Sequence, residues 1–309
     1  MSSIKLLLSV TIFFLFGFYS FPQDKSDTSS THNKGENATE SKECHNNDFD
    51  FDWEEEAMAF MLKGSPTMSL NYGQSQISHK NITSSFTDPN LLELRLGYTY
   101  IRNSKYSEDI LKYRFNHLFL SNFYTDDNND NSINDEIKTN MWRFGIGWSS
   151  GYGYNLGKFS ITPYYSYALA WSQVKFNDAT LDSADKLIAD RYNETFRFGT
   201  GSEVGVNFRF IPMLSLDVAY ERSIIFERHL FMKWVGSGLI EAISQGLLDT
   251  FIGRIAKSSP AALPIINVLL KGALAYGLYE LRQEKMNWPF PSAPPMSYDQ
   301  WKVGLTFNF

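Results

Sequence analysis

From about residue 65 onward, large apolar side chains occupy every second position along most of the chain. No other feature of the sequence constrains the fold as strongly as this alternation. The segment "LLELRLGYTY" sets Leu92, Leu94 and Leu96 against Glu93 and Arg95. Successive side chains of a β-strand point to opposite faces, so the pattern predicts strands with one apolar and one polar face. About eight segments follow this pattern, at 67–72, 91–100, 111–119, 141–148, 158–171, 196–210, 214–221 and 301–309.

The composition of the two faces decides which of them faces inward. The polar face is rich in Gly, Ser and charges of both signs, whereas the apolar face is dense in aromatic residues, which make up 16% of the chain. The mean hydropathy of −0.28 argues against a bundle of membrane helices, but a membrane barrel exposes only alternate residues to lipid. We therefore expect an up-and-down antiparallel transmembrane β-barrel with its polar face inside. A soluble barrel or sandwich is the alternative.

The connections between the expected strands alternate in length. "YNLGK" and "IP" are tight, whereas "YTDDNNDNSINDEIK" and "NDATLDSADKLIADRYNE" are long and polar. Short turns at one end and long loops at the other are typical of outer-membrane barrels, whose turns face the periplasm. This pattern predicts an even number of strands.

The N-terminal part reads as a targeting region. Lys5 precedes the apolar run "LLLSVTIFFLFGF", which predicts a signal peptide over residues 1–22; a single membrane anchor is the alternative. Residues 23–56 are rich in Ser, Thr, Asn and charged side chains, so we expect a disordered periplasmic linker before a barrel at 57–309. Cys44 is the only cysteine, so no intrachain disulfide is expected.

The segment "WKVGLTFNF" ends on an aromatic residue in the middle of the alternation. Bacterial outer-membrane proteins resemble this ending, and the whole pattern is similar to that of the small OmpA- and OmpX-like barrels. The resemblance implies a location in the outer membrane of a Gram-negative-type bacterium, with lipid and the barrel-assembly machinery as partners. It also implies that the last strand is read as an assembly signal, here carried by Trp301, Val303, Leu305, Phe307 and Phe309.

Charged residues on the polar faces are expected to meet in the lumen. They either line an ion path or form a paired plug, and we expect the plug because about eight strands leave an interior just wide enough for side chains. Burying one of these charges without a partner would be costly. The expected network comprises Glu93, Arg95, Lys112, Arg114, Arg143, Glu203, Arg209, Asp217, Glu221 and Lys302.

Two other patterns suggest chemistry only weakly. Asp126, Asn128, Asp130 and Ser132 alternate as in a calcium loop, but the loop lacks the glycine and glutamate of an EF-hand at their required positions, so neither a metal nor another cofactor is expected.

A resemblance to lipid A deacylases, barrels that use His, Ser and an acid on the outer wall, is faint. His117 and Ser121 share a strand face that is expected to point to lipid. Their spacing is His-x-x-x-Ser-Asn where those enzymes have His-x-Ser-Asn, which separates the two side chains by roughly 13 Å along a strand.

Residues 229–283 break the period of two. Apolar residues recur every four positions, which predicts a helix, and "SSPAALP" separates it from a second one. Charged residues punctuate both helices and argue against membrane spans, so we expect an extracellular hairpin at the barrel mouth. It either caps the barrel, docks another protein or lies as an amphipathic element in the outer leaflet. Its candidate interaction surface comprises Val235, Leu239, Ile243, Leu247, Phe251 and Ile255.

The sequence thus favours a non-enzymatic outer-membrane barrel with a structural or partner-binding role through its loops and hairpin. A narrow channel and a lipid-modifying enzyme are the alternatives. The net charge of −6 gives no support for nucleic acid as a partner.

Overall fold

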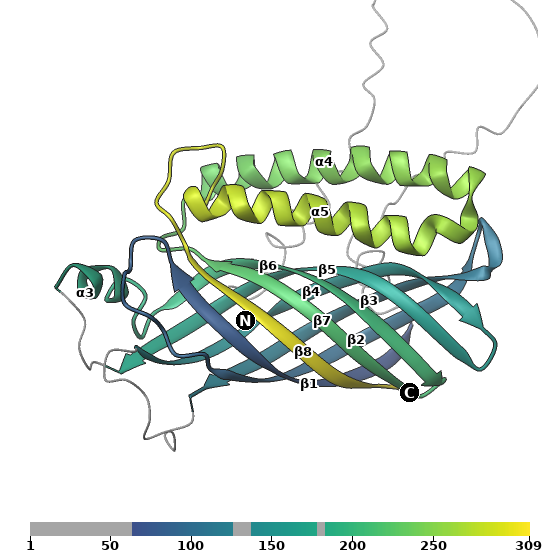
Figure 1. Ribbon diagram of the computed structural model, residues 1–309, viewed down its shortest axis with the longest axis horizontal. Helices are drawn as coiled ribbons and strands as arrows, with labels where there is room; N and C mark the ends of the chain where they lie inside the picture. Colours follow the sequence, from purple (N-terminus) through teal and green to yellow (C-terminus); the bar gives the residue numbers. More distant parts are fainter. Residues whose placement is uncertain (1–63, 126–136, 178–182) are drawn as a thin grey trace, which may run out of the picture. The chain divides into compact units, whose positions relative to one another are not determined.

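The computed structural model describes residues 64–125, 137–177 and 183–309, where eight antiparallel strands close into a barrel (Figure 1). The predicted signal peptide and linker, and the four residues considered for calcium, lie outside these ranges. Each strand pairs with its neighbour in sequence, and β1 also pairs with β8. The strands are β1 (Ser65–His79), β2 (Asn90–Ser104), β3 (Ser107–Tyr124), β4 (Lys138–Leu156), β5 (Phe159–Asn177), β6 (Phe196–Ile211), β7 (Leu214–Ile225) and β8 (Met296–Asn308).

The two ends of the barrel differ as the connection lengths predict. At the turn end, residues 105–106, 157–158 and 212–213 join successive strands. Gly157 in the second of these turns has a φ of 82°, a left-handed conformation that favours glycine. The opposite, loop end carries the longer connections, and the short helix α3 (Ser183–Ala189) belongs to one of them.

The last strand closes the ring. Leu305 of β8 lies opposite Leu70 of β1 on one side and Leu216 of β7 on the other. Beyond the strand, the Phe309 amide donates a hydrogen bond to the Pro66 carbonyl at 2.8 Å. The residues expected to form an assembly signal all lie on the outside of the barrel, exposed, and they are Trp301, Val303, Leu305, Phe307 and Phe309.

Strand β3 is turned over relative to the sequence expectation. Tyr113, Phe115 and Phe119 are buried inside the barrel, while Leu118 on the other face is 63% exposed. Both faces of β3 carry large apolar residues, so alternation alone does not distinguish them. Tyr113 and Phe115 pack in the lumen against Tyr164 of β5, and this contact fixes the orientation of the strand.

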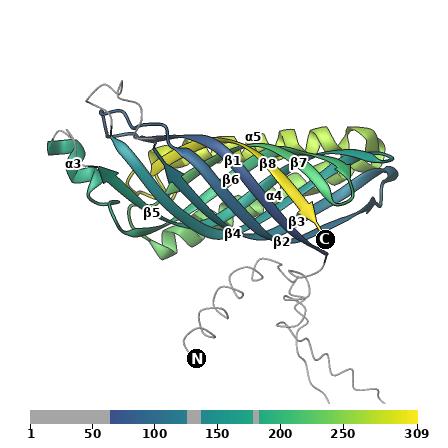
Figure 2. The ribbon, with the colours of Figure 1, turned by 90° about the horizontal axis from the view of Figure 1, so that it is seen from below.

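Between β7 and β8 the chain forms the helices α4 (Phe231–Ser258) and α5 (Leu263–Glu284), joined through the short helix η1 (Pro260–Ala262). The helical hairpin is confirmed, but it does not cover the barrel mouth. Both helices lie along the outer wall (Figures 1 and 2), and α5 contacts β4, β5, β6 and β7. The bend between the helices reaches the turn end, where Ala256 and Leu263 pack with Ile110 of β3.

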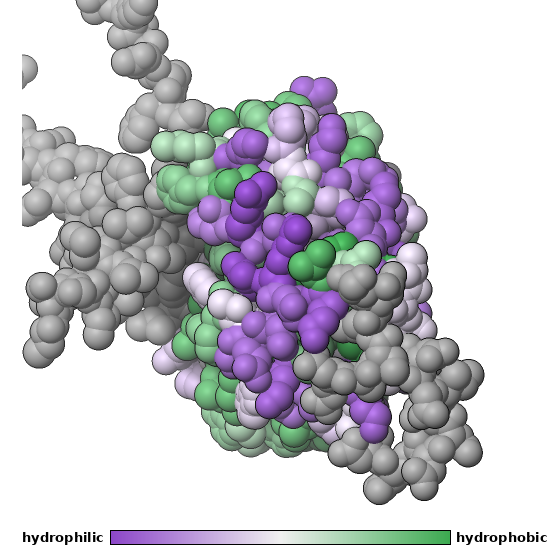
Figure 3. Space-filling model, turned by 90° about the vertical axis from the view of Figure 1, so that its left-hand side faces the viewer, coloured by the Kyte–Doolittle hydropathy of each residue, from purple (hydrophilic) through white to green (hydrophobic). Residues whose placement is uncertain are grey.

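The surface of the barrel has an apolar side and a polar end. Figure 3 looks onto the loop end, where hydrophilic side chains gather across the middle and hydrophobic ones lie towards the margins. The strands that the hairpin leaves bare expose an apolar belt, as expected for a wall that faces lipid. Its members are Met68, Leu70, Tyr72, Leu92, Leu96, Leu118, Leu120, Trp301, Val303, Leu305 and Phe307.

Candidate functional site

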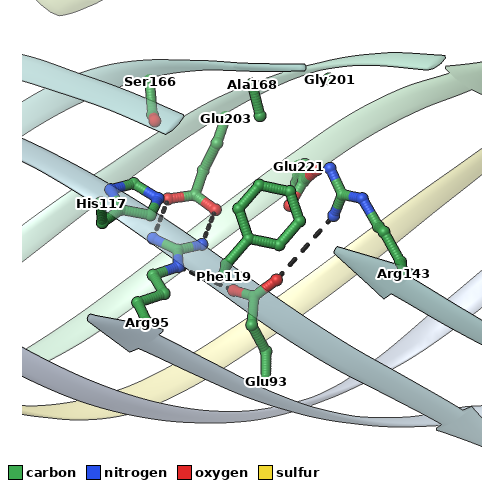
Figure 4. Close-up of a pocket in the computed structure, with 10 residues that line it drawn as sticks. All are labelled: Glu93, Arg95, His117, Phe119, Arg143, Ser166, Ala168, Gly201, Glu203 and Glu221. Carbon is green, nitrogen blue, oxygen red and sulfur yellow. Dashed lines mark hydrogen bonds and ion pairs between the residues drawn. The ribbon is translucent and has the colours of Figure 1, made fainter. Parts of the chain in front are cut away.

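A cluster of charged side chains fills the middle of the lumen (Figure 4). It contains three carboxylates and three cations, so its formal charge is zero. Strand alternation brings them together, because each occupies an inward position and is buried. The lumen network, as we call it below, consists of Glu93 and Arg95 of β2, Arg143 of β4, Glu203 of β6, Glu221 of β7 and Lys302 of β8.

Arg95 joins two of these carboxylates across the barrel. Its Nη1 and Nη2 donate to the two oxygens of Glu203 at 3.0 and 2.6 Å, and its Nε donates to Glu93 at 2.7 Å. The contact with Glu203 is bidentate, which is the strongest geometry available to a guanidinium and a carboxylate. Since β2 and β6 lie on opposite sides of an eight-strand ring, Arg95 spans the lumen.

Lys302 occupies the centre of the network. Its ammonium forms ion pairs with all three carboxylates, including one of 3.2 Å to Glu93. Arg143 donates from Nη2 to Glu221 at 2.6 Å, and its guanidinium lies 4.5 Å from the ring centroid of Phe119. The partners of the three cations are thus carboxylates and aromatic faces of the barrel itself, although Nε and Nη1 of Arg143 donate no hydrogen bond within the described residues.

Neutral side chains donate further hydrogen bonds to the three carboxylates. Ser121 donates to Glu93 at 2.8 Å, Tyr164 to Glu203 at 3.0 Å, and Gln300 to Glu221 at 2.6 Å. The sequence analysis missed these three members. Gln300 was detectable, because it shares the inward parity of Lys302 on the same strand, whereas the position of Ser121 was hidden by the wrong orientation of β3.

The lumen network leaves almost no free space. The cavity at its centre, lined by His117, Phe119 and Ser166 among others, has a volume of about 10 Å³ (Figure 4). That is room for about one water molecule. The middle of the barrel is therefore filled by side chains and is not an open path.

Apolar layers close the lumen on both sides of the network. Towards the turn end, Tyr113 and Tyr164 pack together with Ala219. Towards the loop end, inward residues of the strands pack against Ile82, Phe86 and Ile188 from the loops. The strand residues of this loop-end cap are Ile77, Leu91, Phe123, Met141, Val174, Phe176, Ile225, Met296 and Tyr298.

A buried carboxylate fixes two of the loops to each other. Oδ2 of Asp185 in α3 accepts hydrogen bonds from the backbone and side chain of both Thr83 and Ser84, at 2.8 to 3.1 Å. Burial raises the pKa of the Asp185 carboxyl, but the four donors outweigh burial and hold the pKa below its ordinary value. The sequence analysis gave no sign of this Asp185 clamp.

Asp217 and Arg209 face the lumen apart from the network. Asp217 accepts hydrogen bonds from Asn207 at 2.9 Å and from Thr306 at 2.5 Å, so neutral donors hold it. Arg209 lies near the turn end, half-buried, on the same face of β6 as Asn207.

The expectation that Lys112 and Arg114 face the lumen is wrong. Both belong to the outward face of β3, because the inner face of this strand is taken by Tyr113 and Phe115.

The expectation that His117 and Ser121 point to lipid is also wrong, for the same reason. Both are buried in the lumen. His117 stacks on Phe115, with ring centroids 4.5 Å apart, while Ser121 donates to Glu93. The pair therefore does not form an outward catalytic site. In the described ranges, no three His, Cys, Asp or Glu side chains are grouped as metal ligands would be.

Several charged residues of the hairpin form ion pairs between the two helices or with the barrel wall. Glu241 and Arg282 form an ion pair of 2.8 Å between the helices, with both side chains mostly buried, and Asp249 pairs with Lys271 at 2.7 Å. Arg222 on the outer wall donates to Glu280 of α5 at 2.9 Å.

The predicted interaction surface of α4 divides into two parts. Four residues are exposed and point away from the barrel, namely Leu239, Ile243, Leu247 and Phe251; Val235 and Ile255 are half-buried.

Solved structures that are similar to the chain include Neisserial surface protein A, with 10% identity and a TM-score of 0.34 over 79% of this chain and 97% of that one. They also include the attachment invasion locus protein Ail of Yersinia pestis, with 9% identity and a TM-score of 0.32 over 80% of this chain and 99% of that one. OprG of Pseudomonas aeruginosa has 11% identity and a TM-score of 0.27 over 81% of this chain and 98% of that one. No curated protein matches the chain. The family model of the outer membrane protein beta-barrel domain matches residues 56–241. Since this match covers more than half of the chain, the protein belongs to the outer membrane β-barrel domain family and is an integral outer-membrane protein.

Proposed function

We propose that this protein is a closed outer-membrane scaffold that acts through its outer surfaces, binding a partner with its loops and its helical hairpin. The observation that carries the proposal is the filled lumen, where a neutral network surrounds a cavity of about 10 Å³. An ion crossing this barrel would have to displace Lys302 or Arg95 from buried carboxylates. Breaking a buried pair costs about 3–5 kcal/mol for each charge left alone, so transport through the lumen is disfavoured.

The arrangement of the hairpin supports a place within the membrane, contrary to the expectation from its charges. Pro260–Glu284 is long and apolar enough to cross a membrane. At 1.5 Å per residue, α5 alone is about 33 Å long, close to the thickness of the hydrocarbon core. Lys271 and Arg282 of α5 are mostly buried and pair with Asp249 and Glu241 of α4, while the hairpin exposes Leu239, Leu247 and Leu269.

The barrel wall beneath the hairpin supports the same placement. Outward positions of β5 and β6 carry Tyr165, Tyr167, Thr200 and Ser202, where the bare strands carry Leu, Trp and Phe. Polar groups of this kind are unfavourable against lipid but acceptable against a helix. We take the hairpin to be a fixed part of the wall, whose outer face is offered to neighbours in the membrane.

Electrical recording tests the closed state. Purified protein inserted into a planar bilayer should show no regular conductance steps. A variant with Arg95→Ala, Arg143→Ala and Lys302→Ala removes the cations that fill the lumen, and is the positive control for an opened barrel if it still inserts. Regular conductance steps from the unchanged protein would contradict the proposed closed scaffold and favour the alternative, a narrow channel.

Site-specific photo-crosslinking in the native membrane tests partner binding. A photoreactive residue at Leu247 of α4 should cross-link to another protein, whereas one at Leu118 of β3 should label lipid alone. The two positions form a matched pair, because their side chains are 70% and 63% exposed. Lipid labelling at both positions would leave the hairpin with a structural role and contradict the partner-binding part of the proposal.

A further inference from the structure

Four cationic side chains gather on the outer wall near the turn end, on β2, β3 and the turn between them. They are Arg102, Lys105, Lys112 and Arg114, and we call them the basic patch. Arg102 lies directly opposite Lys112 in the strand pairing, and Arg114 lies opposite Tyr100. Like charges placed directly opposite destabilise an antiparallel pair, so this arrangement calls for a neutralising anion.

The carboxylates of the described residues do not neutralise the facing cations Arg102 and Lys112. Within the described part of the chain, no ion pair is formed by Arg102, Lys105 or Lys112. Asp249 of α4 is the nearby acid on the hairpin, and it is held by Lys271 at 2.7 Å.

Other charges around the basic patch leave it positive. Glu108 and Asp109 at the start of β3 are the acids of this region, and both are exposed. The last turns of α4 pass close to Tyr106 and bring two more cations, Arg254 and Lys257. The wall at this level therefore keeps an excess of positive charge.

Aromatic residues locate the basic patch at a membrane boundary. Towards the middle of the barrel, β2 and β3 expose Leu96 and Leu118, which belong to the apolar belt. Tyr98 and Tyr100 lie between the belt and Arg102 on the outer face of β2. Tyr106, Tyr152 and Tyr154 lie at the level of the basic patch itself, since Tyr152 is directly opposite Lys112. Outward tyrosines of this kind are typical of the girdles that mark the headgroup level.

We infer that the basic patch binds the phosphate headgroup of an anionic phospholipid in the periplasmic leaflet. The turn end of such a barrel faces the periplasm, so the patch meets headgroups of that leaflet. A guanidinium matches phosphate oxygens with a planar pair of donors, and a lysine adds charge. Leu96 and Leu118 lie further towards the middle of the same two strands and provide apolar wall for the acyl chains.

Native mass spectrometry of the full-length protein tests this inference. The protein is released from micelles that contain equal amounts of phosphatidylglycerol and phosphatidylcholine, and the retained lipids are counted. The unchanged protein should prefer phosphatidylglycerol. Arg102→Gln and Lys112→Gln should each lower that preference about fivefold, because each basic residue near a charged surface contributes about that factor.

Lys158→Gln is the matched control, since Lys158 is an exposed lysine of another turn at the same end. It should leave the preference unchanged, and the heat-dependent gel shift verifies that every variant is folded. An equal loss in the Lys158 variant would mean diffuse attraction and overturn the site. Equal retention of both lipids by the unchanged protein would also overturn it. Displacement of the lipid by inorganic phosphate would assign the basic patch to free phosphate instead.

Discussion

Arg95 connects opposite walls of the barrel through one guanidinium, because it contacts Glu93 of its own strand and Glu203 across the lumen. Arg95→Met would remove the bidentate donor of Glu203 and one donor of Glu93, and would leave Lys302 and Arg143 to balance three buried carboxylates. We expect a loss of about 3–5 kcal/mol in the free energy of unfolding. Urea unfolding in lipid vesicles, followed by tryptophan fluorescence, measures this loss.

Arg209→Met provides the control for this substitution. Arg209 also faces the lumen, but it lies near the turn end and outside the lumen network, so its replacement should cost about 1 kcal/mol or less. Similar losses for both variants would contradict the role given to the lumen network.

Acid should release the Asp185 clamp. The folded pKa of this carboxyl lies below its ordinary value of 3.8, so the ionised form contributes stability at all pH values above that point. This stability is lost as the pH falls through the folded pKa. Hydrogen exchange at Thr83 and Ser84, corrected for intrinsic rates, should therefore rise relative to the strands when the pH is lowered from about 6 to about 3.

Asp185→Asn removes the titrating group while keeping the shape of the side chain. This variant should show faster exchange at Thr83 and Ser84 at neutral pH and no further acid response. An unchanged acid response would mean that another group controls the two loops.

Alternation placed Glu93, Arg95 and Lys302 inside the barrel correctly, because parity along a strand is a local property. It failed for Lys112 and His117, since both faces of β3 carry apolar residues and local parity is then ambiguous. Which carboxylate meets which cation depends on the pairing of strands around the whole ring, and no local pattern carries that information.

At the scale of the elements, the ion pair between Glu241 and Arg282 holds α4 to α5 beside the barrel. Glu241→Leu would leave Arg282 buried without its carboxylate. We expect the free energy of unfolding to fall by about 3–5 kcal/mol. The heat-dependent gel shift should therefore occur at a lower temperature.

The double variant Glu241→Leu with Arg282→Leu tests the cause of that loss. Replacing both members of a buried pair by apolar residues is often neutral or stabilising, so the double variant should recover most of the lost stability. A double variant less stable than Glu241→Leu would mean that Arg282 acts through other contacts, such as its hydrogen bond to Ser237.

The four-residue period of apolar side chains predicted the two helices correctly, but it did not predict where they lie relative to the barrel. The segments 226–230 and 285–295 that connect the hairpin to the barrel are compatible with a place over the mouth or along the wall. The polar outer face formed by Tyr165, Thr200 and Ser202 favours the position along the wall, because the helices shield these polar groups from lipid. The sequence shows that face only once the strands are paired.

At the scale of the whole molecule, the apolar surface consists of one bare half of the barrel and one half covered by helices. Three leucines of similar exposure allow the bare wall, the hairpin and the loop end to be compared. They are Leu118 on β3, Leu247 on α4 and Leu187 on α3, which are 63%, 70% and 67% exposed. Replacing Leu118 or Leu247 by Lys should cost about 2–4 kcal/mol near the middle of the membrane. Leu187→Lys should cost almost nothing, because that residue lies outside the membrane.

Urea unfolding of the three variants in vesicles measures these costs on a common scale. If Leu247→Lys behaves like Leu187→Lys, the hairpin lies outside the hydrocarbon and its proposed position is wrong. If Leu118→Lys costs nothing, the barrel belt itself is misplaced.

The insertion of the hairpin between β7 and β8 has a consequence for the order of biogenesis. Strand β8 joins β7 to β1, and the chain passes through both helices before reaching it. The ring therefore stays open during synthesis until the helical segment has been made. Whatever inserts this protein must keep a seven-strand sheet and a pair of charged helices from aggregating, and must admit them to the bilayer together before the seam is sealed.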